Sequence, residues 1–194
     1  MAQPGDIIEH PITGERVTFL RTTEETGGEY VRAELAVAPG GFVSLAHIHP
    51  RQEERFTVKS GALTVVVDGK TSRLGPGESI RIAAGTPHEW RNADPVEMVA
   101  IVEFFPALSA EDCFESAFGL AQDGKVDPVS GIMEQPWLAL LLVTHHDFIA
   151  PVDPPQEILL EQLRPIADEA IRQGFTLPYP YPHHRLAEET RASA

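Results

Sequence analysis

The chain has 194 residues, of which 42% are hydrophobic and 23% charged, a composition typical of one folded domain or of a domain with an extension. Its formal net charge of −14 would repel a phosphate backbone, and no cluster of Lys or Arg offsets that charge locally, so we expect no nucleic-acid partner. The strongly apolar, nearly uncharged stretch at residues 136–146 is shorter than the ~20 residues that cross a bilayer. We therefore expect no membrane span.

Residues 1–105 show the pattern of short antiparallel strands separated by turn signals. Apolar residues alternate with polar ones in residues 31–37, 54–58, 63–67 and 80–82, and residues 96–105 form a last apolar strand. The dipeptide Asp68-Gly69 suits a tight hairpin turn between two of these strands. The sequence predicts an all-β first segment.

From residue 106 the apolar residues follow the period of helices instead. A first helix of about 15 residues is predicted to begin with a capping box of Ser109 and Asp112 and to stop at Gly124. A second helix, apolar on nearly all sides, is predicted to run from Pro136 to about Phe148. The second segment is therefore predicted to be helical.

A third helix is predicted to open near residues 153–156 and to end at Gly174, with a kink at Pro165. Alternating prolines after Thr176 favour an extended arm. The predicted organisation is a β-barrel in residues 1–105, followed in residues 106–194 by an α-helical extension with a Pro-rich C-terminal arm.

Four side chains of the β segment have the types and the spacing of metal ligands. His47 and His49 are two residues apart on a strand and so point to one face, Glu54 begins the next strand, and His88 follows a turn. Three neutral imidazoles and a carboxylate can hold one divalent transition metal and leave positions for water, oxygen or substrate. These ligands do not discriminate among Fe, Mn, Ni, Cu and Zn.

Glu53 competes with Glu54 for the role of acidic ligand. Glu54 has the same parity as Phe56, which is predicted to face inward, and we therefore expect Glu54 to bind the metal and Glu53 to be solvated.

Two stretches of the chain resemble the two sequence motifs of the cupin superfamily. The first motif is matched by Gly41, His47, His49, Glu54 and Gly61, and the second by Gly77, Gly85, His88 and Asn92. Ala83 departs from the pattern, which usually has proline there, but this position shapes a turn and does not bind the metal. The resemblance covers about residues 30–105 and implies a mainly β fold with a single cupin barrel, also called a double-stranded β-helix or jelly roll.

A closed barrel of this size would hold the metal against inward-facing side chains. We predict that Phe56, Trp90 and Met98 contact the substrate, and that Val58 and Leu45 belong to the same wall. An apolar, aromatic wall favours a small, flat or hydrophobic ligand over a sugar phosphate. No Arg or Lys is clearly placed inward, although the pattern leaves the positions of three arginines open, namely Arg32, Arg81 and Arg91.

Three functions remain open at this point. The resemblance to flavonol-cleaving cupin dioxygenases implies an oxygenase in which an enol or phenol binds the metal and Glu54 takes its proton. The same metal could instead polarise a carbonyl for isomerisation or decarboxylation, or the barrel could bind a small molecule without turnover. The oxygenase is favoured, because the chain has no basic DNA-binding segment and no inward cluster of basic residues for charged sugars.

The helical extension is expected either to close the open end of the barrel or to form a homodimer interface. Cupins are commonly dimeric, so the resemblance favours the homodimer. A single cysteine and an N-terminus without a signal segment predict a cytoplasmic protein.

Five further residues are weighed as candidate site residues. His145 and His146 are neighbours on a helix and point about 100° apart, so we expect them to be surface residues near a helix end. His183 and His184 are expected to lie in a solvated tail, and Cys113 to pack on the apolar face of its helix.

Overall fold

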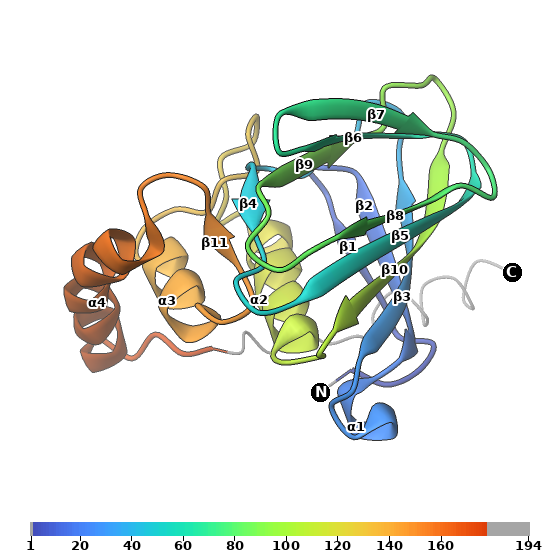
Figure 1. Ribbon diagram of the computed structural model, residues 1–194. Coiled ribbons are helices and arrows are strands. Elements are labelled where there is room, and N and C mark those ends of the chain that lie inside the picture. The colour runs from blue at the N-terminus through green and yellow to red at the C-terminus, as the bar shows by residue number, and fades with distance from the viewer. Residues whose placement is uncertain (1, 178–194) are drawn as a thin grey trace, which may run out of the picture.

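A computed structural model describes residues 2–177 as two antiparallel β-sheets with helices on one side (Figure 1). The strands are β1 Ile7–His10, β2 Glu15–Arg21, β3 Val31–Val37, β4 His47–Ile48, β5 Glu53–Ser60, β6 Leu63–Val67, β7 Lys70–Leu74, β8 Ser79–Ile82, β9 His88–Arg91, β10 Met98–Phe105 and β11 Ala150–Pro151. The helices are α1 Thr23–Thr26, α2 Ala110–Gln122, α3 Trp137–Thr144 and α4 Gln156–Arg172. The predicted mainly β fold with C-terminal helices is confirmed.

The strands form a six-stranded sheet in the order β1-β2-β3-β10-β5-β8 and a five-stranded sheet in the order β11-β4-β9-β6-β7. All strand pairs are antiparallel. Neighbours that are distant in sequence, such as β3 and β10, show that the chain crosses between the sheets, as in a jelly roll. Within residues 2–177 the pairing gives two facing sheets and does not continue round as one closed barrel.

Strand alternation places the apolar side chains between the two sheets. Val31 and Leu35 of β3 are buried there, and so is Phe56 of β5. The predicted hairpin joins β6 to β7, and its two residues, Asp68 and Gly69, have φ of 50° and 74°, as a type I′ turn requires. The β segment therefore folds as its sequence pattern predicts.

The helical segment shares a core and a sheet with the β segment. Cys113 of α2 and Leu141 of α3 belong to the same hydrophobic cluster as the inward residues of the sheets. Pro151 of β11 pairs with His47 of β4, so the five-stranded sheet includes a strand from beyond residue 105. The shared core and sheet do not mark a boundary between two domains, and the division into segments 1–105 and 106–194 remains a prediction.

Two helix ends differ from the prediction. Ser109 precedes α2 as predicted, but its hydroxyl makes no capping hydrogen bond and instead lies 2.8 Å from Nδ1 of His145. The second helix, α3, ends at Thr144, because the chain then turns so that Phe148 enters the core. The third helix, α4, contains Pro165 as predicted.

The described helices carry no apolar stretch long enough to cross a membrane. The predicted Pro-rich arm after Thr176 lies almost entirely outside the described residues.

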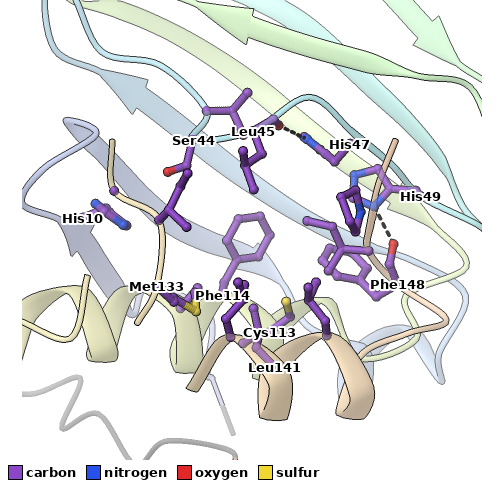
Figure 2. A pocket seen from close by; sticks show the side chains of 18 of the residues that line it. His10, Ser44, Leu45, His47, His49, Cys113, Phe114, Met133, Leu141 and Phe148 are labelled. Atoms are coloured by element: carbon purple, nitrogen blue, oxygen red, sulfur yellow. Dashed lines mark hydrogen bonds between the residues drawn. The ribbon is translucent and has the colours of Figure 1, made fainter. Parts of the chain in front are cut away.

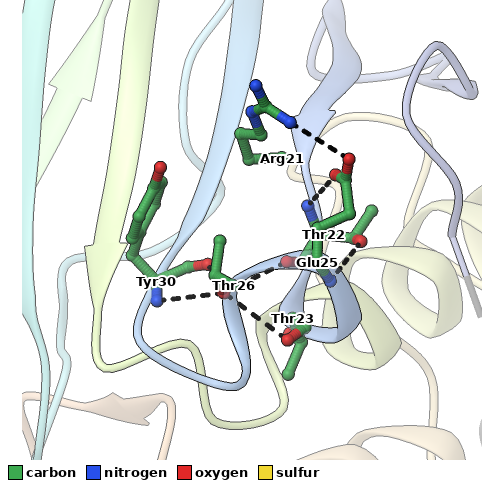
Figure 3. Close-up of polar contacts among 6 residues, drawn as sticks. All are labelled: Arg21, Thr22, Thr23, Glu25, Thr26 and Tyr30. Carbon is green, nitrogen blue, oxygen red and sulfur yellow. Dashed lines mark hydrogen bonds and ion pairs between the residues drawn. The ribbon is translucent and has the colours of Figure 1, made fainter.

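A short helix that the sequence analysis did not anticipate, α1, connects β2 to β3 (Figure 3). Its capping box consists of Thr22 Oγ1, which accepts from the backbone N–H of Glu25 at 3.4 Å, and Glu25 Oε2, which accepts from the N–H of Thr22 at 3.1 Å. The N–H of Thr23 donates to Glu111 of α2 at 3.1 Å. This contact fastens α2 to the connection between β2 and β3 of the six-stranded sheet.

Candidate metal centre

Strand pairing brings the four predicted ligands together between the sheets. His47 of β4 lies directly opposite His88 of β9, with ring centroids 4.3 Å apart. His49 follows on the same face as His47, and Glu54 reaches the group from β5 in the other sheet. The potential ligand atoms of the four side chains all lie within 4.8 Å of one another. We call these four residues the metal-ligand group.

The metal-ligand group is buried, with exposures of 2–5%, yet several of its polar atoms are unsatisfied. Nε2 of His49, Nε2 of His88 and Oε2 of Glu54 have no hydrogen-bond partner among the described residues. Oε2 of Glu54 lies 2.8 Å from Nε2 of His88, but this contact lacks the geometry of a hydrogen bond. Buried polar atoms without partners cost free energy, and a cation bound among them would remove that cost.

Each histidine of the metal-ligand group is held by a backbone carbonyl oxygen that lies close to Nδ1. The pairs are His47 with Leu45 at 2.9 Å, His49 with Phe148 at 2.7 Å, and His88 with Thr86 at 2.9 Å. A carbonyl oxygen only accepts, so Nδ1 carries the hydrogen and donates it. Nε2 of each neutral ring then has a free lone pair, which is the form of histidine that binds a metal.

Burial keeps two of these rings neutral. It lowers the pKa of His47 to about 3 and the pKa of His49 well below its ordinary value, and neighbouring imidazoles add to both effects. Burial also lowers the pKa of His88, but the Glu54 carboxylate beside it outweighs this effect, and the net pKa of His88 is raised. The raised pKa favours a proton on Nε2 of His88, and a divalent cation bound there would displace that proton.

Phe148 is a residue of the site that the sequence analysis missed. Its carbonyl oxygen fixes His49, which is 99 positions away in the sequence, and its ring lies 4.8 Å from the His49 ring between centroids. The sequence pattern places Phe148 at the end of a helix and gives no sign of this long-range contact. The helical segment thus supplies part of the support for the metal-ligand group.

Glu53 and Glu54 have the different environments that the sequence analysis predicts. Glu54 is 3% exposed and faces inward. Glu53 accepts a hydrogen bond from Arg81 Nη2 at 2.7 Å and also pairs with Arg55, at the surface of β5. Hydrogen bonds from Arg81 and Arg55 lower the pKa of Glu53.

A cavity of about 400 Å³ adjoins the metal-ligand group and extends between the sheets and the helices (Figure 2). His47, His49 and Glu54 are part of its lining. The aromatic residues that line it are Phe56, Trp90, Phe104, Phe114, Phe118 and Phe148. Within residues 2–177 the lining includes no Lys or Arg, and three arginines that the sequence left open, Arg32, Arg81 and Arg91, are outside it. The wall is therefore mostly apolar.

Two of the three predicted substrate contacts line this cavity. The rings of Phe56 and Trp90 lie edge to face, with centroids 6.3 Å apart. Met98 and Val58 are buried in the core and are outside the cavity lining, whereas Leu45 belongs to it. Strand parity indicates the face on which a residue lies, but it does not show how far along the strand an open space extends.

His145 was predicted to lie at the surface, but the structure buries it. It is 2% exposed, its Nδ1 lies next to Ser109 Oγ, and burial lowers its pKa to about 4. The prediction assumed that the helix continues past His145, whereas α3 ends there and the turn carries the ring inward. His146 is exposed as expected. The remaining two histidines of this set, His183 and His184, lie outside the described residues.

Cys113 is buried and packs in the core, as predicted, and burial raises the pKa of its thiol. The thiol is therefore held in its protonated, unreactive form.

Residues 33–102 of the chain match the family described as the cupin domain. No curated protein matches the chain. Similar solved structures include a cupin-superfamily sugar phosphate isomerase from Silicibacter pomeroyi, KdgF from Halomonas sp. and a predicted oxalate decarboxylase from Thermotoga maritima.

The isomerase is 24% identical over 50% of this chain and 62% of its own length, with a TM-score of 0.44. KdgF is 22% identical over 48% of this chain and 79% of its own, with a TM-score of 0.42. The decarboxylase is 16% identical over 55% of this chain and 98% of its own, with a TM-score of 0.48. At these identities the likeness concerns the fold alone.

Proposed function

Because residues 33–102 of the chain belong to the cupin family, we propose that the protein is a mononuclear-metal oxygenase, of the dioxygenase type, for a small, largely apolar enol or phenol. The observation that carries the proposal is the convergence of three imidazole Nε2 lone pairs and one carboxylate beside an apolar cavity. His47, His49, Glu54 and His88 would hold the metal. A bound Fe, Mn, Ni, Cu or Zn ion would supply a positive charge that stabilises an ionised substrate oxygen.

Glu54 has a second role in this proposal, as the proton acceptor. Its Oε2 is buried without a hydrogen-bond partner among the described residues, and its side chain lines the cavity. The Glu54 carboxylate oxygen that does not hold the metal would accept the hydroxyl proton of the enol or phenol as the substrate ionises. The apolar wall around it keeps water from competing for the substrate.

The lining of the cavity supports the class of substrate. Phe56 and Trp90 offer aromatic surfaces to a flat molecule. A sugar phosphate or a dicarboxylate would need cationic partners, and the described lining has no Lys or Arg. This observation favours the oxygenase over an isomerase or lyase of charged substrates, which would use the same four ligands.

The helices serve as a cover for the cavity in this proposal. Leu138 and Leu141 of α3 line the cavity, and α3 also packs against α4 through Ala139 and Leu140. The predicted homodimer depended on an exposed apolar face of this helix, and much of that face is buried within the chain. The homodimer therefore remains a prediction, to be tested by sizing in solution.

Oxygen uptake tests the proposed reaction. The protein, purified without a histidine tag, is loaded in turn with Fe, Mn, Ni, Cu and Zn and given a panel of flat enols and phenols that includes a flavonol. We expect oxygen consumption with at least one pair of metal and substrate. Glu54→Gln should lower the rate by about 100-fold or more, because it removes both a ligand and the proton acceptor.

The matched control is Glu53→Gln, which changes the neighbouring, solvent-facing carboxylate. This variant should keep the wild-type rate of oxygen uptake. If no combination of metal and substrate consumed oxygen while the panel bound to the protein, the chain would be a binding protein and the oxygenase proposal would be wrong.

A further inference from the structure

The cavity has a second polar end that the proposed metal chemistry does not use. His10, at the end of β1, and Glu15, at the start of β2, pair across the two strands and both line the cavity. They are 5% and 7% exposed. In Figure 2, His10 lies on one side of the cavity and His47 and His49 on the other, with Phe114 between them. We call His10 and Glu15 the distal pair.

The backbone fixes which ring nitrogen of His10 carries the hydrogen. Nδ1 accepts from the N–H of Ile12 at 3.3 Å and from the N–H of Thr13 at 3.1 Å. Burial lowers the pKa of His10 to about 4, so the ring is neutral near pH 7. The hydrogen is therefore on Nε2, and the hydrogen bonds of this ring to other described residues all involve Nδ1. The ring can donate a hydrogen bond to a molecule in the cavity.

Glu15 also uses only part of its hydrogen-bonding capacity. Its Oε2 accepts from Thr13 Oγ1 at 2.6 Å, while Oε1 has no partner among the described residues. Burial raises the pKa of this carboxyl to about 7, so the neutral and ionised forms both occur near neutral pH. Burial of a carboxyl against apolar residues costs stability, and a hydrogen-bonding ligand would offset part of that cost.

The surroundings of the distal pair limit what can bind there. A carboxylate or phosphate would face Glu15 without any Lys or Arg among the described lining residues. An ammonium group could not accept the hydrogen of His10 Nε2. A hydroxyl can accept from His10 and donate to Glu15, so it satisfies both partners at once.

The two ends of the cavity are well separated along the sheet. Glu15 pairs with Val37 and Val37 with Met98, whereas Glu54 pairs with Phe104 at the other end of β10. The stretch of β10 between those two pairings rises about 20 Å. A molecule that contacts both ends must therefore be extended, with several rings or a comparable chain.

We propose that the distal pair binds a hydroxyl group at the far end of an extended apolar ligand whose other end lies at the metal-ligand group. The second half of this statement rests on the proposed function. The first half concerns only His10 and Glu15 and holds for a binding protein as well as for an enzyme.

The test compares two three-ring probes that differ by one hydroxyl, a 1,4-distyrylbenzene with a para-hydroxyl on both outer rings and a 1,4-distyrylbenzene with a para-hydroxyl on one outer ring. Affinities are measured by calorimetry, with metal-free and with metal-loaded protein. We expect the wild type to bind the dihydroxy probe about 10-fold more tightly, a typical value for one well-placed hydrogen-bonding group. The variants His10→Phe and Glu15→Leu should each reduce this preference to about twofold or less.

The matched control is His146→Phe, which changes an exposed histidine outside the cavity. This variant should show the same preference of about 10-fold for the dihydroxy probe as the wild type. The Glu15→Gln side chain still donates and accepts hydrogen bonds, so this variant should keep most of the preference for the dihydroxy probe. It also serves as the test at this position if Glu15→Leu does not fold. The inference is overturned if the wild type shows no preference, if either His10→Phe or Glu15→Leu retains it, or if neither probe binds.

Nitrogen-15 NMR of the histidine rings is a second test, independent of any ligand. The spectrum should show the hydrogen of His10 on Nε2 at pH 7, and a hydrogen on Nδ1 would overturn the inference. The two proposals fail separately. Preference for the dihydroxy probe without oxygen uptake defeats only the oxygenase, whereas oxygen uptake without the preference defeats only the distal contact.

Discussion

The metal-ligand group and the distal pair use the same kind of residue in opposite ways. At the metal-ligand group, Nδ1 of each histidine donates to a backbone carbonyl, which leaves a lone pair on Nε2. At the distal pair, Nδ1 of His10 accepts from backbone N–H groups, which leaves a hydrogen on Nε2. The first arrangement suits a cation and the second repels one. The polarity of the backbone beside a buried imidazole thus decides whether it is a metal ligand or a hydrogen-bond donor.

His145 is an intermediate case. Its Nδ1 lies beside a hydroxyl, which can donate or accept, and its Nε2 is buried without a partner among the described residues. The backbone therefore does not fix the ring hydrogen of His145. The comparison predicts that it contributes packing and one hydrogen bond, and no metal or ligand contact.

Removal of a ligand from the metal-ligand group should have the largest effect. We expect the wild type to hold about one metal ion per chain, and His49→Ala and Glu54→Ala to bind it more than 100-fold less tightly, since each removes one of about four ligands. Metal content by mass spectrometry and affinity by competition with a chelator measure this. Glu53→Ala should bind metal like the wild type. Equally low metal content in the wild type and both variants would exclude the site.

Phe148→Ala tests whether the carbonyl contact orients His49. The loss of a buried aromatic ring should lower the free energy of unfolding by about 3–5 kcal/mol. Metal affinity should fall by about 10-fold to 100-fold, because the segment that positions the His49 ring loosens. Urea unfolding and metal titration measure the two effects. As a control, Val129→Ala changes a side chain that is 81% exposed and should change neither. Unchanged affinity in Phe148→Ala would contradict the orienting role.

Glu15 should make the stability of the protein depend on pH. Its pKa rises from 4.5 to about 7 on folding, so the unfolded chain loses this proton first and the free energy of unfolding falls as pH rises through that interval. Glu15→Gln should therefore be more stable than the wild type above pH 7, by up to about 3 kcal/mol, and should match it at acid pH. Urea unfolding at several pH values measures the difference.

Glu53 is the control for Glu15, because its effect on stability should depend on pH in the opposite direction. Arg81 and Arg55 lower the pKa of Glu53, so its contribution to stability is present above pH 4.5 and is lost as pH falls. Glu53→Gln should thus lose a little stability near neutral pH and none in acid. If both variants showed the same dependence on pH, the environment assigned to Glu15 would be wrong.

Ser109→Ala should have the smallest effect of this series. It removes the partner of His145 Nδ1 and leaves the buried ring without a hydrogen bond, at a cost of about 1–2 kcal/mol in unfolding free energy. Ser109→Thr keeps the hydroxyl and should retain most of the stability. Metal affinity should be unchanged in both variants, and a large loss of metal in Ser109→Ala would show that His145 belongs to the site.

The strands and the metal-ligand group can be predicted from the sequence, because strand parity and motif spacing depend on residues that are close together in the chain. His47 and His49 share a face by alternation, and the same alternation separates Glu54 from Glu53. The burial of Glu15 could also have been predicted from the sequence, since Glu15 shares the inward parity of Val17 in β2.

The remaining features depend on contacts between distant parts of the chain. The carbonyl of Phe148 reaches His49 only because α3 ends early and β11 joins the sheet. The same turn buries His145, contrary to the prediction. No local pattern around Ser109 distinguishes a helix cap from a partner for a distant imidazole, so the predicted capping box was wrong.

The hydrogen bond from His49 to Phe148 also bears on the order of events during synthesis. A ribosome delivers all four metal ligands well before it delivers the carbonyl that orients one of them, which comes 99 residues after His49. A nascent chain stalled between these points would carry the ligands without their full support and would hold a cation weakly. Stable acquisition of the ion therefore waits until the helices have been made and have docked.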